Sequence, residues 1–214
     1  DLRLEAGRHG GGLSQAAVRG TVGDRVALLV TGAFGGSGVR LGFTAPSPGL
    51  AEPLAGTPRR FPEAIRDRIA SSILGRVEQR WALPPRTEFD GTPGTGRSAL
   101  WVRLREPAGV PVDSALLAMF GDFALAALPE AVGELTYAVS LDNSVRITGE
   151  ASTDWVLLDI SVEAVFRDIA HVSARMFDED GTLVAVATQS AMVRRLVDGR
   201  RRRLTAPEPR VQPS

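Results

Sequence analysis

The chain has 214 residues, 43% of them hydrophobic and 23% charged, and its 25 basic residues balance 25 acidic ones. This composition is ordinary for a folded globular domain, and the zero net charge argues against a nucleic-acid binder that depends on phosphate contacts. Cysteine is absent, which excludes disulfides, zinc–thiolate sites and thiol nucleophiles.

Segments that would direct the chain to a membrane are not apparent. We find no apolar run near the roughly 18–20 residues of a membrane span. Residues 1–12 lack the basic-then-apolar layout of a signal peptide. We therefore expect a cytoplasmic protein with neither a membrane nor a nucleic acid as partner.

The first sixty residues predict a hairpin followed by a loop. The runs 13–20 and 24–34 are strand-like, and Gly23 between them can supply the positive φ of a tight turn. Residues 35–60 are rich in glycine and proline, which is typical of a connecting loop.

A short helix and two more strands follow. Isoleucines spaced by four residues predict an amphipathic helix over 61–74, with Pro62 near its start. Strand-like runs then occupy 76–83 and 98–106, on either side of a loop rich in proline and glycine.

The strongest helix signal begins near Val112 and runs to about residue 131. Pro111 marks its start, and Pro129 and Gly133 mark its end. Its apolar residues occupy nearly every face, and a helix of that kind is usually buried. Only strands follow, as far as Leu196.

One long buried helix followed by antiparallel strands predicts an α+β fold. A strongly curved antiparallel sheet wrapped around a central helix buries the helix and the inner strand faces together, which is the hotdog arrangement. The first half of the chain supplies strands of similar character without an equivalent helix. Residues 198–214 are charged and contain proline, and we expect a disordered tail there.

Two glycine-rich segments resemble known functional motifs but lack the neighbouring sequence that each motif requires. The run from His9 to Gly12 is similar to the oxyanion loop of esterases, but the chain has no G-x-S-x-G nucleophile segment, so we predict a turn. Gly36-Ser37-Gly38 is not followed by a helix, which excludes a dinucleotide fingerprint. With two histidines far apart, we expect no metal and no cofactor.

Two polar residues inside the late strands are the candidate site residues, Asp142 and Gln189. Gln189 shares its strand face with small residues, which leaves room for a ligand or a neighbouring backbone; these are Ala185, Ala187 and Ala191. A buried amide costs about 1–3 kcal/mol unless it is hydrogen-bonded. Spacing alone leaves two interpretations open. Either the pair has structural roles, in capping and in backbone bonding, or it holds and activates a water molecule.

Four segments of the second half resemble, in the right order, the acyl-CoA thioesterase II family, whose members are double hotdogs. They are GDFALAAL (with Asp122 and Phe123), SLDNSVRI, DWVLL and DGTLVAVATQSAMVR, within residues 99–196. The resemblance implies a partial first hotdog over 1–106, with a loop and helix insertion over 35–75. It implies a second hotdog over 107–197. The first strand and central helix of the family's first hotdog have no counterpart in this chain.

The resemblance also implies a function. The family hydrolyses acyl-CoA thioesters, in fatty acid metabolism, with a water held by Asp, Gln and Thr side chains and without a covalent intermediate. Carried over to this chain, Asp142 is the general base or water orienter, and Gln189 holds the same water. The implied partners are an acyl-CoA or acyl-thioester substrate and further copies of the chain in a homo-oligomer.

Two positions depart from the family pattern. Counting back from Gln189 without gaps places the family's threonine at Ala164, which has no hydroxyl, and Ser161 and Thr188 are the candidate replacements. Asn143 stands where the family has histidine. These departures keep a second hypothesis open, a non-catalytic acyl-binding or scaffolding hotdog. A third, a hydratase or dehydratase, would need His171 paired with an acid.

Overall fold

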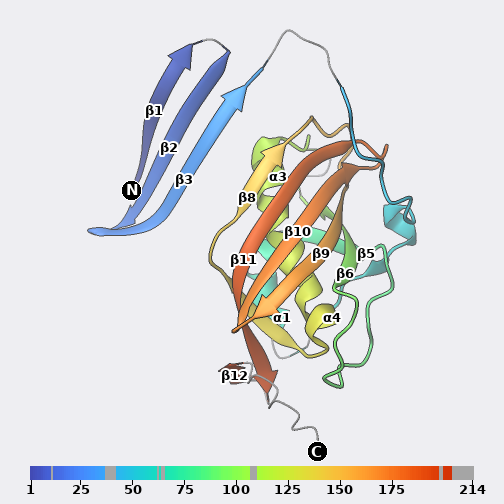
Figure 1. Cartoon of the computed structure of the whole chain (residues 1–214). Helices are drawn as coiled ribbons and strands as arrows, with labels where there is room; N and C mark the ends of the chain where they lie inside the picture. Colours follow the sequence, from blue (N-terminus) through green and yellow to red (C-terminus); the bar gives the residue numbers. More distant parts are fainter. Residues whose placement is uncertain are drawn as a thin grey trace, which may run out of the picture. The chain divides into compact units, whose positions relative to one another are not determined.

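The computed structural model describes residues 1–10, 12–36, 42–61, 63, 66–106, 110–197 and 200–203. Contacts between residues divide the chain into two compact units, Asp1–Phe43 and Thr44–Ser214. Each unit is described by itself (Figure 1).

The first unit is an antiparallel sheet with the order β1-β2-β3, formed by β1 (Leu2–Gly10), β2 (Leu13–Val22) and β3 (Arg25–Gly35). The predicted hairpin is confirmed in β2 and β3, and Gly23 takes a φ of +57° in their turn. The first strand, β1, is additional. A turn at Gly12, with a φ of +80°, joins it to β2, as predicted for the glycine run. Apolar side chains of this sheet are exposed, among them Leu4 and Leu29.

The second unit contains a nine-stranded antiparallel sheet in its described part. The strand order is β12-β11-β10-β9-β6-β5-β4, and β7 and β8 both pair with β11. The bounds are β4 Thr57–Pro58, β5 Val77–Trp81, β6 Arg97–Leu104, β7 Thr136–Ser140, β8 Ser144–Ile147, β9 Val156–Phe166, β10 Ile169–Asp178, β11 Leu183–Val197 and β12 Arg200–Arg203.

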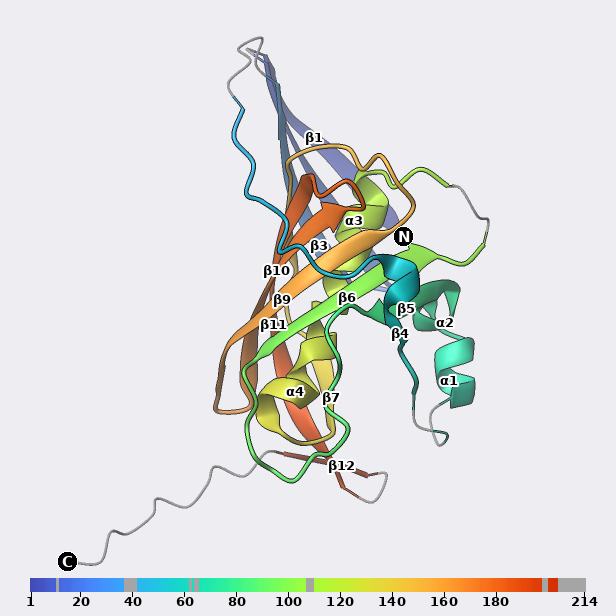
Figure 2. The same ribbon diagram turned by 90° about the vertical axis from the view of Figure 1, so that its right-hand side faces the viewer.

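One helical stretch lies against a face of this sheet (Figures 1 and 2). It consists of α3 (Ser114–Gly121), the 3-10 helix η3 (Asp122–Ala127) and α4 (Leu128–Val132). Asp113 caps its start by accepting a hydrogen bond from Leu116 N at 2.9 Å. Gly133, with a φ of +74°, ends it. Pro129 was expected near the end but opens α4, because proline is tolerated in the first turn of a helix.

The main core lies between this helical stretch and the sheet. Leu117, Phe120 and Leu128 of the helices are fully buried, in one hydrophobic cluster with side chains of β6, β9, β10 and β11. A Cβ on Gly121 would lie 3.1 Å from the Cβ of Ala187, so helix and β11 are in close contact there. The small residues of β11 therefore accommodate a neighbouring backbone, one of the two possibilities that the sequence left open.

The same helical stretch corrects the expectation about apolar runs. Ser114–Val132 has 19 residues and a mean hydropathy of 1.6, which by length and composition alone fits a membrane span. In the structure this stretch is the core helix, and its large side chains pack against the strands.

The two contact units do not coincide with the division into two hotdogs at residue 106, which stays a prediction. Strands β5 and β6 belong to the second unit, because β6 pairs with β9 from Arg97–Ser161 to Val102–Val156. The structure places the boundary between Phe43 and Thr44. Pairing between β6 and β9 joins residues about sixty positions apart, which local sequence patterns do not reveal.

The predicted helix over 61–74 is divided in two, α1 (Arg66–Ala70) and α2 (Ile73–Arg76). The break lies at Ser71 and Ser72, whose hydroxyls donate to carbonyls of the preceding turn, and Ser72 also caps α2. Pro62 and Ile65 lie outside the described residues. A short 3-10 helix, η1 (Pro53–Ala55), precedes β4 in the predicted loop.

Residues 200–203 of the predicted tail are not without structure. They form β12, which pairs antiparallel with residues 194–197 at the end of β11. The expectation of a disordered tail is therefore wrong for these four residues. Residues 198, 199 and 204–214 lie outside the described part of the chain.

Candidate active site

Asp142 lies in the short segment between β7 and β8, and this segment holds its carboxylate against the backbone of β11. Ser140 pairs with Ala191 and Ser144 with Thr188, so three residues of one strand stand opposite two of β11. This bulge turns Asp142 toward the backbone, where its Oδ1 accepts a hydrogen bond from Ser190 N at 2.7 Å. Asp142 itself is exposed, and in the described part of the chain no hydrogen bond engages its second carboxylate oxygen.

Gln189, on β11, is the buried member of the site, with 3% of its surface exposed. Its Nε2 donates to Ser140 Oγ at 2.8 Å and also to the carboxylate of Asp122. Ser140 Oγ in turn donates to the carbonyl oxygen of Asp142 at 3.0 Å. The structure thus joins Asp142 and Gln189 in one hydrogen-bond network through Ser140.

The side-chain oxygen of Gln189 is buried and accepts no hydrogen bond from any residue in the described ranges. Its direction follows from its neighbour, because the Asp122 carboxylate can only accept and so must face the Nε2 group. An unsatisfied buried acceptor costs about 1–3 kcal/mol. Such groups are rare in folded proteins, and one that is joined through Ser140 to the backbone carbonyl of Asp142 marks a candidate site.

Sequence reasoning did not assign Ser140 and Asp122 to this network. Asp122 and Ser140 were noted only as parts of segments that match the family. What assigns them to the site is contact with distant residues. Asp122, at the start of η3, is 67 positions away from Gln189 on β11. Only the packing of helix against sheet reveals such a contact.

The candidate replacements for the family threonine lie on the other side of the sheet. A bulge at Glu163 shifts the register, so that Val162 pairs with Val172 but Ala164 pairs with His171. His171 lies on the face away from the central helix, opposite to that of Gln189.

Ser161 and Thr188 both pair with Ser173, which lies on that same outer face. Within the described residues, Gln189 pairs with Val172 of β10, and Val172 pairs with Val162 of β9. Val162 is therefore the helix-facing residue of β9 in the same row across the sheet as Gln189, and it has no hydroxyl. Asn143 is exposed beside Asp142.

His171 is exposed, and its Nδ1 lies 3.3 Å from Ser190 Oγ. In the described part of the chain it contacts no carboxylate. The histidine–acid pair that a hydratase would need is therefore not formed among these residues.

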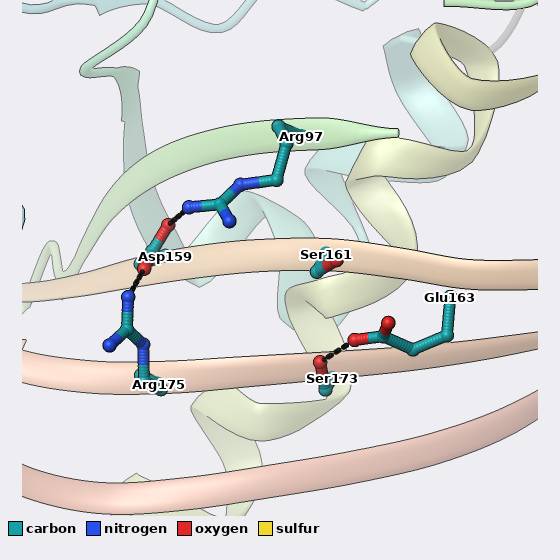
Figure 3. A pocket seen from close by; sticks show the side chains of 6 residues that line it. All are labelled: Arg97, Asp159, Ser161, Glu163, Ser173 and Arg175. Carbon is teal, nitrogen blue, oxygen red and sulfur yellow. Dashed lines mark hydrogen bonds and ion pairs between the residues drawn. The ribbon is translucent and has the colours of Figure 1, made fainter. Parts of the chain in front are cut away.

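A polar pocket of about 320 Å³ opens on the outer face of β6, β9 and β10 (Figure 3). Asp159, with 5% of its side chain exposed, accepts from Arg97 at 3.0 Å and from Arg175. Glu163 accepts from Ser173. The two arginines and two carboxylates of the lining balance in charge, and both carboxylates already have donors. This pocket contains neither Asp142 nor Gln189 and forms a self-satisfied polar cluster.

No group of three or more His, Asp or Glu side chains that could hold a metal ion occurs within the described ranges. The described residues place two oxygen acceptors at the site, one charged and exposed on Asp142 and one neutral and buried on Gln189.

The sheet, the enclosed helix and the strand order place the second unit in a known structural class. The chain has a TM-score of 0.72 with a hotdog-fold protein of unknown function from Alicyclobacillus acidocaldarius, at 16% identity, over 91% of this chain and 73% of that one. The molecule is therefore an α+β protein of the hotdog class, as the sequence predicted.

The family follows from sequence. The profile of the acyl-CoA thioesterase C-terminal domain matches residues 50–193, and the chain belongs to this family. A protein assigned as a thioesterase from Novosphingobium aromaticivorans is 32% identical, with a TM-score of 0.69, over 89% of this chain and 71% of that one. The acyl-CoA thioesterase II TesB2 of Mycobacterium marinum has a TM-score of 0.65 at 20% identity, over 93% and 75%. No curated protein matches the chain in sequence.

Proposed function

We propose that the protein hydrolyses acyl-CoA or a related acyl thioester with a water molecule that Asp142 and Gln189 activate. The observation that carries this proposal is the buried side-chain oxygen of Gln189, which has no donor within the described residues. Membership of the acyl-CoA thioesterase family supports the class of reaction.

The two free acceptors suit one water molecule. Water donates two hydrogen bonds, and the Asp142 carboxylate and the Gln189 amide oxygen both accept. Water held in this way presents a lone pair to the carbonyl carbon of the thioester. Asp142 takes the proton as the new C–O bond forms, and the thiol carrier leaves with that proton when the tetrahedral intermediate collapses. A thioester is activated enough for a positioned water and a base to suffice.

Release of free thiol from acyl-CoA substrates of increasing chain length tests the proposal. We expect Asp142→Asn to lower kcat by about 100- to 10,000-fold, because a general base is lost. We expect Gln189→Ala to lower kcat as well, with the folded state retained in circular dichroism. Full hydrolysis by both variants would show that the assigned roles are wrong.

Matched controls separate chemistry from folding. Gln79→Ala removes another buried glutamine, on β5, and Asp168→Asn removes a carboxylate from the turn between β9 and β10. Neither residue belongs to the network of Gln189, so both variants should retain the kcat of the wild type.

A second candidate function is the binding of acyl thioesters without turnover. The observation that favours it is the position of Ala164, Ser161 and Thr188 on the outer face, which leaves the water with fewer anchors. Tight binding of acyl-CoA in calorimetry, with no thiol released, would favour this function over hydrolysis.

A further inference from the structure

We propose that Asp122 is a positioning residue, which fixes the orientation of the Gln189 amide so that its oxygen faces the water site. This inference rests on the proposed function and deepens it. The geometry behind it is the hydrogen bond from Gln189 Nε2 to the Asp122 carboxylate, at the junction of α3 and η3.

A glutamine amide has two orientations that differ by a half-turn about its last torsion, and that torsion has little intrinsic preference. Ser140 cannot decide between them, because a hydroxyl both donates and accepts. Asp122 can decide, because a carboxylate only accepts. In the observed orientation both Nε2 protons are used, one on Ser140 and one on Asp122.

The reversed orientation would be penalised at both contacts. The Gln189 oxygen would lie against the Asp122 carboxylate, acceptor against acceptor. Ser140 would have to donate to that oxygen and so release the carbonyl of Asp142, which it contacts at 3.0 Å. The backbone beside the proposed base would lose a hydrogen bond at the same time. Asp122 therefore acts on both residues of the site. It fixes the amide of Gln189 directly, and it allows Ser140 to keep its hydrogen bond to the carbonyl of Asp142.

The fold brings Asp122 to this place through the residue before it. Gly121 has no side chain, and a Cβ there would lie within 3.2 Å of three side-chain carbons, on Ala187, Met176 and Val145. The helix can therefore approach β11 two residues from Gln189, on the same strand face. Asp122 is itself exposed, so water could satisfy its carboxylate, and its bond to Gln189 is not needed for its own burial.

Steady-state kinetics with three variants of Asp122 test the inference. Asp122→Ala removes the acceptor, and Asp122→Ser replaces it by a group that donates as readily as it accepts. We expect both to lower kcat by about 10- to 100-fold, with KM changed less than about twofold, because the water is misplaced while the substrate still binds. Asp122→Glu keeps a carboxylate that can only accept, and we expect it to restore kcat to within about threefold of the wild type.

A control on the same helix excludes a merely structural effect. Asp113→Ala removes the N-cap of α3 and should lower Tm, but it should leave kcat unchanged. If Asp122→Ala kept the kcat of the wild type, or if Asp122→Glu lost as much as Asp122→Ala, the inference would be overturned.

Nuclear magnetic resonance of the Gln189 side-chain amide gives a readout that needs no turnover. Its signals are identified by their loss in Gln189→Leu. We expect slow hydrogen exchange of this amide in the wild type and in Asp122→Glu, and faster exchange in Asp122→Ala and Asp122→Ser. A wild type that releases no thiol but shows this pattern would contradict the proposed hydrolysis and support the positioning role. Equal exchange in all four proteins would contradict the positioning role.

Discussion

Gln189 is a buried amide whose side-chain oxygen has no protein donor within the described residues. Methionine has a similar length and no such oxygen. In Gln189→Met the removed cost of burying a polar amide, about 1–3 kcal/mol, offsets the two hydrogen bonds lost from Nε2, at about 1 kcal/mol each. We therefore expect urea unfolding to give a free energy of unfolding within about 1 kcal/mol of the wild type, while thiol release is abolished.

The same replacement at Gln79 is the matched comparison. Gln79 is also a buried glutamine, with 4% exposed, but its amide oxygen accepts from Arg59 Nη1 at 2.7 Å. Burial lowers the pKa of Arg59 to about 10, so this guanidinium is poorly hydrated and depends on its protein acceptor. We expect Gln79→Met to lose about 1–3 kcal/mol in the same measurement. Equal losses at both positions would mean that the loss at Gln79 does not come from its hydrogen bond to Arg59.

At the residue scale, the sequence singled out two side chains of the candidate site but not what each one contacts. Asp142 and Gln189 were singled out because a carboxylate and an amide interrupt apolar strands. Their partners Ser140 and Asp122 were not assigned to the site. A hydrogen bond across 67 positions depends on how the helix packs, which is a tertiary property.

Among the elements, β5 and β6 are joined by an ion-pair group on Glu78. Its carboxylate accepts from Arg103 Nη2 at 2.8 Å and from Arg80 Nε at 2.9 Å. Burial acts to raise the pKa of Glu78, but the hydrogen bonds and charges of Arg103 and Arg80 outweigh it and hold the pKa below 4.5. Because the pKa of Glu78 is lower in the folded chain than in the unfolded chain, the ionised carboxylate stabilises the fold at pH values above the unfolded-state pKa. This stabilisation is lost as the pH falls through the folded-state pKa.

We therefore expect the stability gap between the wild type and Glu78→Gln to be largest at neutral pH. It should narrow as the pH falls below 4.5, because the carboxylate then becomes protonated in the wild type. Urea unfolding at a series of pH values measures the gap. Exposed Glu52, changed to Gln, is the control for loss of one charge. A Glu78 gap that stays constant down to pH 3 would argue against this stabilisation.

The predictions of helices and strands were correct where the pattern of apolar residues was long, and they were wrong where a single residue interrupts it. The strands β9, β10 and β11 and the core helix follow from strong alternation and from a long apolar run. The helix continued through Pro129 because proline fits a first turn, and the helix over 61–74 broke because serine hydroxyls bond to its own backbone. Each of these details depends on a single side chain, and one residue changes the periodic pattern of apolar residues very little.

For the whole molecule, the two buried hydrophobic clusters lie entirely within residues 44–214. All three tryptophans are there too, and Trp101 and Trp155 are 5% and 4% exposed. A separate core is the mark of an independent folding unit. We expect a chain of residues 44–214 to melt in one cooperative transition, with the near-ultraviolet circular dichroism of its tryptophans preserved. A gradual melt without tryptophan signals would contradict this expectation.

The class of fold could be predicted from the sequence, but the division into units could not. One buried helix followed by antiparallel strands has few stable arrangements, and a curved sheet around the helix is one of them. Which earlier strands join that sheet is a different question. Strands β5 and β6 resemble those of the first unit in composition, and only their pairing with β9 assigns them to the second.

The extra residue at Glu163 has a practical meaning for protein engineering. Before it, the even-numbered side chains of β9 point to the helix, and after it the odd-numbered ones do, since Val165 pairs with Ala170 of the core. Any comparison that counts positions across residue 163 without a gap therefore exchanges inside for outside. A hydroxyl grafted at Ala164 would face outward, whereas one at Val162 would stand in the same row as Gln189.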